Sequence, residues 1–145
     1  RVFETLVASV RIPALHIADP TAEAVRAAGI ERIGLLGTRF TMEQAFYRDR
    51  LAQHGLEVLV PPPAAREDVH RVIYDELCLG VVAPASRQRY QAIARELIAR
   101  GAQGVILGCT EIGLLLGADD LAVPAFDTTA LHADAAVRAA LAPAG

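Results

Sequence analysis

Apolar residues follow two patterns along the chain, one typical of strands and one typical of helices. Continuous apolar runs at 33–36 and 105–107 are typical of short strands that are buried on both faces of a sheet, and the mostly apolar segment 56–60 predicts a further strand. Between these runs, apolar residues recur every three or four positions, as on the buried face of an amphipathic helix. The alternation of the two patterns predicts an α/β domain with a mostly parallel, buried sheet.

Capping and turn residues set the predicted boundaries. Thr41 and Gln44 have the spacing of a capping box at a helix start, and the prolines at 61–63 predict a loop. The expected elements, in chain order, are a helix before residue 11, a strand at 13–17, helices at 19–28 and 41–54, a strand at 56–60, helices at 67–79 and 86–100, strands at 105–107 and 123–126, and a helix at 128–141.

Composition narrows the class of protein. The chain has 145 residues, 53% of them hydrophobic, which is enough for one buried core. Its net charge is −3 and its basic residues are single, scattered arginines, so nucleic acid is not an expected partner. The apolar runs are too short to cross a membrane, and the first residues do not form a secretion signal. We therefore expect a soluble, cytoplasmic protein whose two cysteines are free thiols.

Two segments of the chain resemble each other. Pro13–Ala28 and Pro124–Ala140 both read as a strand end, an Asp and Thr turn, and an alanine-rich helix. Their separation is longer than a solenoid repeat and suggests two duplicated lobes, although alanine-rich helices can also match by chance. Counting back from Pro13 by the distance that separates Cys109 from Pro124 lands just before Arg1. We therefore expect the chain to be a truncated fragment whose second thiol lies upstream.

Cys109 is the strongest candidate for chemistry. It follows the strand at 105–107 and precedes an apolar helical turn. A helix N-terminus carries partial positive charge, which predicts a lowered thiol pKa and a thiolate that acts as a base. Free backbone N–H groups and the Thr110 hydroxyl would then hold a substrate carboxylate. The alternative is that Cys109 is only a small buried residue.

Four strings resemble the aspartate/glutamate racemase family in order and spacing. They are GVILGCTEI (104–112), IGLLGTRFTMEQAFYRDRL (33–51), VHRVIYDELCLG (69–80) and VPAFDTTALHADAAV (123–137). The resemblance implies a parallel-sheet sandwich of two pseudo-symmetric α/β lobes with the substrate between them. It also implies one catalytic cysteine from each lobe, no pyridoxal phosphate or metal, and a homodimer.

The resemblance assigns parts of this chain to each lobe. Residues 1–18 would end the first lobe, residues 19–126 would form the second lobe with catalytic Cys109, and residues 127–145 would return to the first. Most of the first lobe would then be missing. Thr110, Glu111, Gly37 and Thr38 are the expected substrate-binding residues. The implied function is racemisation of aspartate or glutamate by two thiols, and we expect the chain alone to be inactive because one thiol is absent.

Three further residues are candidate supporting groups. Cys78 projects away from the apolar stripe of its predicted helix, so it would line the cleft or lie on the surface. His132, near the start of the last helix, could tune a thiol. Arg39 could pair with the distal carboxylate of a substrate, although a solvated arginine is the alternative. The histidines match no metal-binding motif, and the chain lacks the lysine that some members of the family carry near the Cys78 region.

Two other functions stay open. One keeps the fold and needs a single cysteine or different chemistry, as in a decarboxylase, a hydantoin racemase or a maleate isomerase. The other is a non-catalytic α/β module that binds an anion at the 34–38 turn, which matches neither the dinucleotide fingerprint nor the P-loop.

Overall fold

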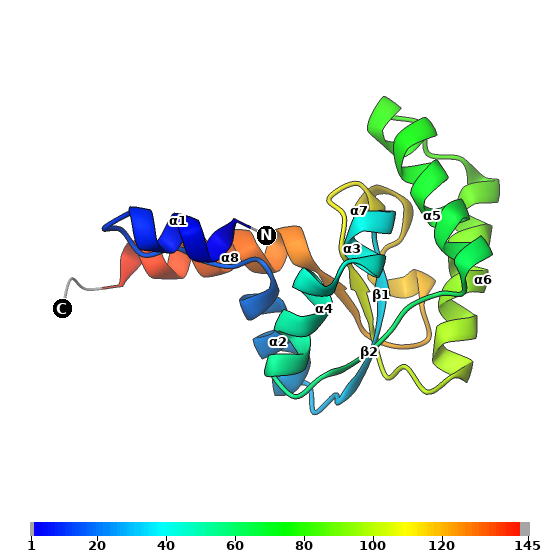
Figure 1. The fold of residues 1–145 in the computed structure, drawn as a ribbon. Helices are drawn as coiled ribbons and strands as arrows, with labels where there is room; N and C mark the ends of the chain where they lie inside the picture. Colours follow the sequence, from blue (N-terminus) through cyan, green and yellow to red (C-terminus); the bar gives the residue numbers. More distant parts are fainter. Residues whose placement is uncertain (1, 143–145) are drawn as a thin grey trace.

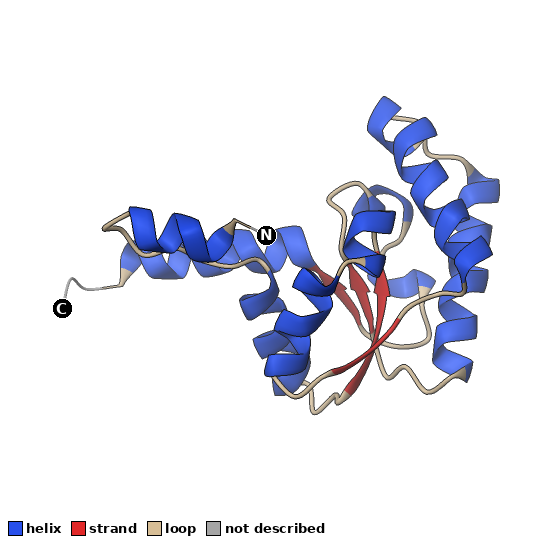
Figure 2. Cartoon of the chain, in the orientation of Figure 1, coloured by secondary structure: helices blue, strands red, loops and turns tan. Residues whose placement is uncertain are grey.

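The computed structural model describes residues 2–142, which form an α/β fold around a four-stranded sheet (Figures 1 and 2). All neighbouring strands are parallel. In spatial order they are β2 (Glu57–Leu59), β1 (Arg32–Leu36), β3 (Val105–Leu107) and β4 (Ala125–Asp127). Leu36 pairs with Leu107, and Leu107 pairs with Asp127, so β1, β3 and β4 end at the same edge. The predicted class of fold is confirmed.

The two central strands are buried on both faces. Ile33, Leu35 and Leu36 of β1 and all of Val105–Leu107 in β3 are at most 3% exposed. Continuous apolar runs suit such strands because neither face meets water. The predicted strands at 33–36, 56–60, 105–107 and 123–126 are confirmed, with ends that shift by one or two residues.

Helices cover both faces of the sheet, with α2 and α4 on one side and α5 and α6 on the other (Figure 1). Pro63 and Pro84 occupy the first helical positions of α5 and α6, where a missing N–H costs nothing. The helices are α1 (Phe3–Ser9), α2 (Ala18–Ala27), α3 (Arg39–Glu43), α4 (Ala45–Gln53), α5 (Pro63–Asp75), α6 (Pro84–Ala99), α7 (Ile112–Leu115) and α8 (Thr128–Leu141), with 3₁₀ turns η1 (Leu77–Leu79) and η2 (Ala118–Asp120).

One predicted strand and two predicted helix boundaries are wrong. Residues 13–17 form no strand and instead connect α1 to α2. No neighbouring strand pairs with this apolar run, and Leu15 and Ile17 are at least 40% exposed. The predicted helix at 67–79 starts earlier, because Pro63 opens α5 rather than extending the loop. It also ends at Asp75, where Glu76 leaves helical geometry and η1 follows.

The predicted capping box at Thr41 and Gln44 is also wrong. The Thr38 hydroxyl accepts the Thr41 N–H at 3.4 Å, so Thr38 caps α3 and the helix begins earlier than expected. Gln44 adopts an extended backbone that separates α3 from α4. A side-chain acceptor three residues before an N–H can cap a helix, and here Thr38 fills that place ahead of Thr41.

The connections make the carboxyl edge between β1 and β3 a point where the strand order reverses. The chain passes from β1 to β2 on one side, then crosses over through α5 and α6 to β3 on the other side of β1. In open parallel sheets, ligands bind outside the carboxyl ends of strands where the order reverses in this way. In Figure 1 this edge lies beside α3 and α7.

Helices α1 and α8, which we call the helical extension, project beyond the sheet on the side of α2 (Figure 1). No residue of α1 is buried in the described structure, and Thr128 is the buried residue of α8. Several large apolar side chains of this part are exposed: Val2, Leu6, Val7, Val137 and Leu141. Within residues 2–142, no helix combines the length and apolar character that crossing a bilayer requires.

Candidate active site

The turns after β1 and β3 meet at the carboxyl edge of the sheet. Gly37 and Thr38 follow β1, and Gly108 and Cys109 follow β3. The Gly108 N–H donates to the Leu36 carbonyl at 2.7 Å, which locks the two turns together. The structure therefore brings the predicted residues of both turns to one place at the carboxyl edge.

Close approach explains the two glycines. A Cβ at position 108 would lie 2.9 Å from the Leu36 carbonyl oxygen, and a Cβ at position 37 would lie 3.1 Å from Thr41 Cβ. A side chain at position 108 would push the ends of β1 and β3 apart, and one at position 37 would press against Thr41 of α3. On the other side of β3, the buried Thr128 hydroxyl donates to the Leu107 carbonyl at 3.0 Å. The backbone that carries Cys109 is thus held from β1 and from α8.

Cys109 is partly buried, and its thiol donates to Glu111 Oε2 at 2.9 Å. Burial, the hydrogen bond to Glu111 and the Glu111 charge raise the pKa of Cys109 to about 12, although the Glu111 N–H acts in the opposite direction. The predicted lowering of this pKa by a helix is wrong. The helix α7 has only four residues and begins at Ile112, so its dipole is small and distant from Sγ.

The four predicted substrate-binding residues differ in their surroundings. Gly37 is buried in the turn, and the Thr38 hydroxyl is engaged with the Thr41 N–H and hydroxyl. Thr110 is exposed next to Cys109. The Glu111 carboxylate accepts from Cys109, so its described contact is with the candidate catalytic thiol.

Cys78 lies close to this site but not on the predicted helix. It sits exposed in η1, which packs against α7. The charge of Cys78, when present, contributes to the raised pKa of Cys109, so the two thiols interact electrostatically. That Cys78 lines the substrate cleft stays a prediction, whereas its predicted place on a helix at 67–79 is wrong, because α5 ends at Asp75.

Arg39 and His132 make other contacts. The Arg39 guanidinium pairs with Glu67 of α5 at 3.2 Å, and it is about half exposed. His132 is partly buried on α8, and its Nδ1 is buried with no hydrogen-bond partner among the described residues. Neither contact joins these residues to Cys109.

Sequence reasoning missed a polar group near Cys109. Glu76 accepts a hydrogen bond from the Ser86 hydroxyl at 2.5 Å, and the fully buried Tyr90 hydroxyl donates to the Val69 carbonyl at 2.7 Å. Burial raises the pKa of Tyr90, and the charges of Cys109 and Glu76 add to this effect. In the sequence, a tyrosine on an amphipathic helix looks the same whether it interacts with a nearby thiol or only packs in the core.

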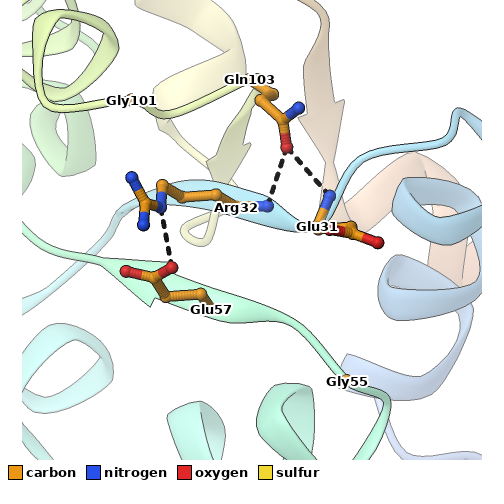
Figure 3. A pocket seen from close by; sticks show the side chains of 6 residues that line it. All are labelled: Glu31, Arg32, Gly55, Glu57, Gly101 and Gln103. Atoms are coloured by element: carbon orange, nitrogen blue, oxygen red, sulfur yellow. Dashed lines mark hydrogen bonds and ion pairs between the residues drawn. The ribbon is translucent and has the colours of Figure 1, made fainter.

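A pocket of about 440 Å³ lies elsewhere, at the amino ends of the strands (Figure 3). The Gln103 side-chain oxygen accepts from the Glu31 and Arg32 N–H groups, and Arg32 pairs with Glu57 at 2.7 Å. These polar groups satisfy one another, so we do not assign a ligand to this pocket. Among residues 2–142, no three His, Cys, Asp or Glu side chains converge in an arrangement that would hold a metal ion.

Comparison with known proteins defines the class. Residues 1–136 match the profile of the Asp/Glu/Hydantoin racemase family. A protein of known structure from Yersinia pestis, assigned as an Asp/Glu racemase, is 53% identical, with a TM-score of 0.93 over 97% of this chain. An aspartate racemase homologue from Pyrococcus horikoshii OT3 is 33% identical, with a TM-score of 0.88 over 96% of this chain. The fold is thus that of Asp/Glu racemase structures.

The chain belongs to the Asp/Glu/Hydantoin racemase family. It is also 25% identical, over 97% of its length, to the broad specificity amino-acid racemase RacX of Bacillus subtilis. The chain spans 62% of the length of each of the two solved structures and 60% of RacX.

Proposed function

We propose that this chain forms the Cys109 lobe of an amino-acid racemase that uses two thiols and no cofactor. The observation that carries the proposal is the position of Cys109 at the switch point between β1 and β3, with its thiol hydrogen-bonded to Glu111. Family membership supports racemase chemistry at this edge.

The reaction needs an acid and a base on opposite faces of the substrate. One thiolate removes the α-proton, and the other thiol delivers a proton to the far face of the carbanion. Cys109 is the proposed thiol of this lobe. We place the second thiol in the part of the relatives that this chain does not span, on the side suggested by the repeat of Pro13–Ala28 in Pro124–Ala140. The chain alone is then inactive, and residues 1–18 and 127–145 contact the other lobe, with residue 1 and residues 143–145 lying outside the described structure.

Residues around the carboxyl edge of β1 and β3 have separate proposed roles. The exposed Thr110 hydroxyl and the Gly37 to Thr38 turn contact the substrate, while Cys78 lines the rim. The substrate is an acidic amino acid, aspartate or glutamate. Because Arg39 is paired with Glu67, it binds the distal carboxylate only if that ion pair opens. His132 is placed at the lobe contact, and the full-length protein is a cytoplasmic homodimer.

A racemisation assay tests this proposal. The full-length gene product and the 145-residue chain are each incubated with L- and D-aspartate and L- and D-glutamate, and the products are separated by chiral chromatography. We expect the full-length protein to invert one of the pairs and the chain alone to be inactive. Cys109→Ala should abolish inversion, whereas the matched exposed substitution Cys78→Ala should retain most of it. Absence of inversion of all four substrates by the full-length protein would refute the proposed substrate class.

The protonated state of Cys109 favours one second candidate. A decarboxylase needs only one thiol, which protonates the carbanion left by the departing carboxylate, and a raised pKa keeps that thiol protonated. Release of carbon dioxide without any inversion of amino acids would favour this alternative. Inversion without carbon dioxide release would exclude it.

A further inference from the structure

We propose that Glu111 is a positioning residue that holds the proton on Cys109 in the resting protein. Cys109 is then the thiol that protonates the substrate carbanion. This inference rests on the proposed function and adds to it which of the two thiols is the acid at the start of the reaction. It assigns Glu111 to the thiol rather than to the substrate. The contact that carries it is the hydrogen bond from Cys109 Sγ to Glu111 Oε2, at 2.9 Å.

The backbone turn fixes this contact. The Ile112 N–H donates to the Cys109 carbonyl at 3.1 Å, and the Leu114 N–H donates to the Glu111 carbonyl at 3.0 Å. Glu111 itself has helical backbone angles, φ −75° and ψ −21°. The turn therefore folds the side chain of Glu111 back toward Sγ, while Thr110 between them is exposed.

Nothing in the described residues neutralises the Glu111 carboxylate. None of the ion pairs within residues 2–142 includes Glu111. A negative charge beside a partly buried thiol acts on it through a medium that screens less than water. The carboxylate therefore accepts the thiol proton in a hydrogen bond and opposes its loss.

Among the other ionisable groups near Cys109, Cys78 of η1 acts in the same direction as Glu111. The Tyr90 hydroxyl of α6 is coupled to Cys109 and to Glu76, and both raise its pKa. The positive group of this cluster, Arg71, pairs with Glu76 at 3.8 Å. The protonated thiol is therefore the stable resting form of Cys109.

The proton balance follows from this arrangement. The partner thiolate removes the α-proton from one face of the substrate, which leaves a carbanion at the α-carbon. The Cys109 S–H bond then breaks, its proton forms the new bond to the α-carbon, and its electron pair stays on sulfur. The resulting thiolate beside Glu111 is a strong base, because a base with a higher pKa removes a weakly acidic proton more readily. In the reverse direction it removes the α-proton from its own face.

Alkylation of Cys109 in this chain tests the role of Glu111 without any racemase activity. In a Cys78→Ala background Cys109 is the single thiol, and its rate of reaction with iodoacetamide is followed by mass spectrometry from pH 7 to pH 10. Glu111→Gln keeps the size of the side chain but removes the charge. We expect its alkylation to be about threefold faster at pH 8 for each unit by which the pKa falls, since lower nucleophilicity offsets part of the gain in thiolate.

Two controls distinguish an effect of the Glu111 charge from a loss of folding or from the removal of any surface carboxylate. Asp119→Asn, at an exposed carboxylate in η2, should leave the rate unchanged. If circular dichroism shows that Glu111→Gln does not fold, Glu111→Ala removes the same charge and should accelerate alkylation in the same way. An unchanged or slower rate in the folded variant overturns the role of Glu111, whereas failure of the racemisation assay with faster alkylation would overturn the proposed function alone.

Discussion

Ile106 of β3 and Val137 of α8 are both aliphatic residues in regular elements, yet Ile106 is 0% exposed and Val137 is 56% exposed. In the sheet, strands and covering helices bury each other's apolar faces. In the helical extension, α8 packs mainly against α2 and β4, and Thr128 is its buried residue in the described structure. The sheet therefore provides the rigid edge on which Cys109 sits, whereas the exposed apolar residues of the extension contribute little to the stability of that edge.

The largest expected effect is in the sheet. Ile106→Ala leaves a cavity in the centre of β3 and should lower the free energy of unfolding by about 2–5 kcal/mol. Ile12→Ala is the matched control, because Ile12 is 74% exposed between α1 and α2. Urea denaturation of both variants measures the difference. Equal losses would contradict the contrast between the two regions.

The contact between the sheet and α8 should have an intermediate effect. Thr128→Val removes the hydroxyl that donates to the Leu107 carbonyl, and it should lower the free energy of unfolding by about 1–3 kcal/mol. Thr129→Val, at the exposed neighbouring position of the same helix, should change it far less. A similar stability for both variants would show that this hydrogen bond does not anchor the strand end.

An ion pair at the start of α2 gives a pH-dependent effect. Arg50 donates to both carboxylate oxygens of Asp19, at 2.6 and 2.8 Å, and this contact lowers the pKa of Asp19 to about 2, with a smaller contribution from His54. A lowered pKa stabilises the fold above pH 4, and this stabilisation is lost as the pH falls from about 4 to about 2.

Asp19→Asn should therefore lower the free energy of unfolding by about 1–2 kcal/mol at pH 7, and by less at pH 3. Urea titrations at both values check this, with Glu23→Gln on the exposed face of α2 as the control. A loss that stays constant between pH 7 and pH 3 would mean that packing, rather than charge, holds Asp19.

The smallest effect is expected in the extension. Val137→Thr keeps the shape of the side chain and its β-branch, so the free energy of unfolding should change by no more than about 0.5 kcal/mol. The same urea titration measures it. A loss above about 1 kcal/mol would show that the exposed face of α8 is covered in solution.

The same contrast explains what the sequence could predict. The apolar runs at 33–36 and 105–107 predict strands because burial on both faces requires continuous apolar residues. The apolar periodicity of α1 predicts a helix equally well, but it does not reveal that the described chain leaves this face uncovered. The short apolar run at 13–17 predicts a strand in the same way, but it does not specify whether a neighbouring strand exists to pair with it.

At the site, the family resemblance implied that residues of both turns contact the substrate, but it did not indicate the state of the thiol. Gly37 and Gly108 lie at one edge because β1 and β3 are adjacent parallel strands. The pKa of Cys109 depends on burial and on the rotamer of Glu111, and neither can be derived from a motif. The helix expected after Cys109 is too short to reverse these effects.

The most direct test of the account is deuterium incorporation at the α-carbon in heavy water, followed by nuclear magnetic resonance. The full-length gene product and its Cys109→Ala variant are each given one pure enantiomer of the substrate. We predict that the unmodified protein exchanges the α-proton of both enantiomers. The variant should lose inversion, and any exchange that remains should be confined to one enantiomer. Inversion by Cys109→Ala at the unmodified rate would contradict the assignment of Cys109 as a catalytic thiol.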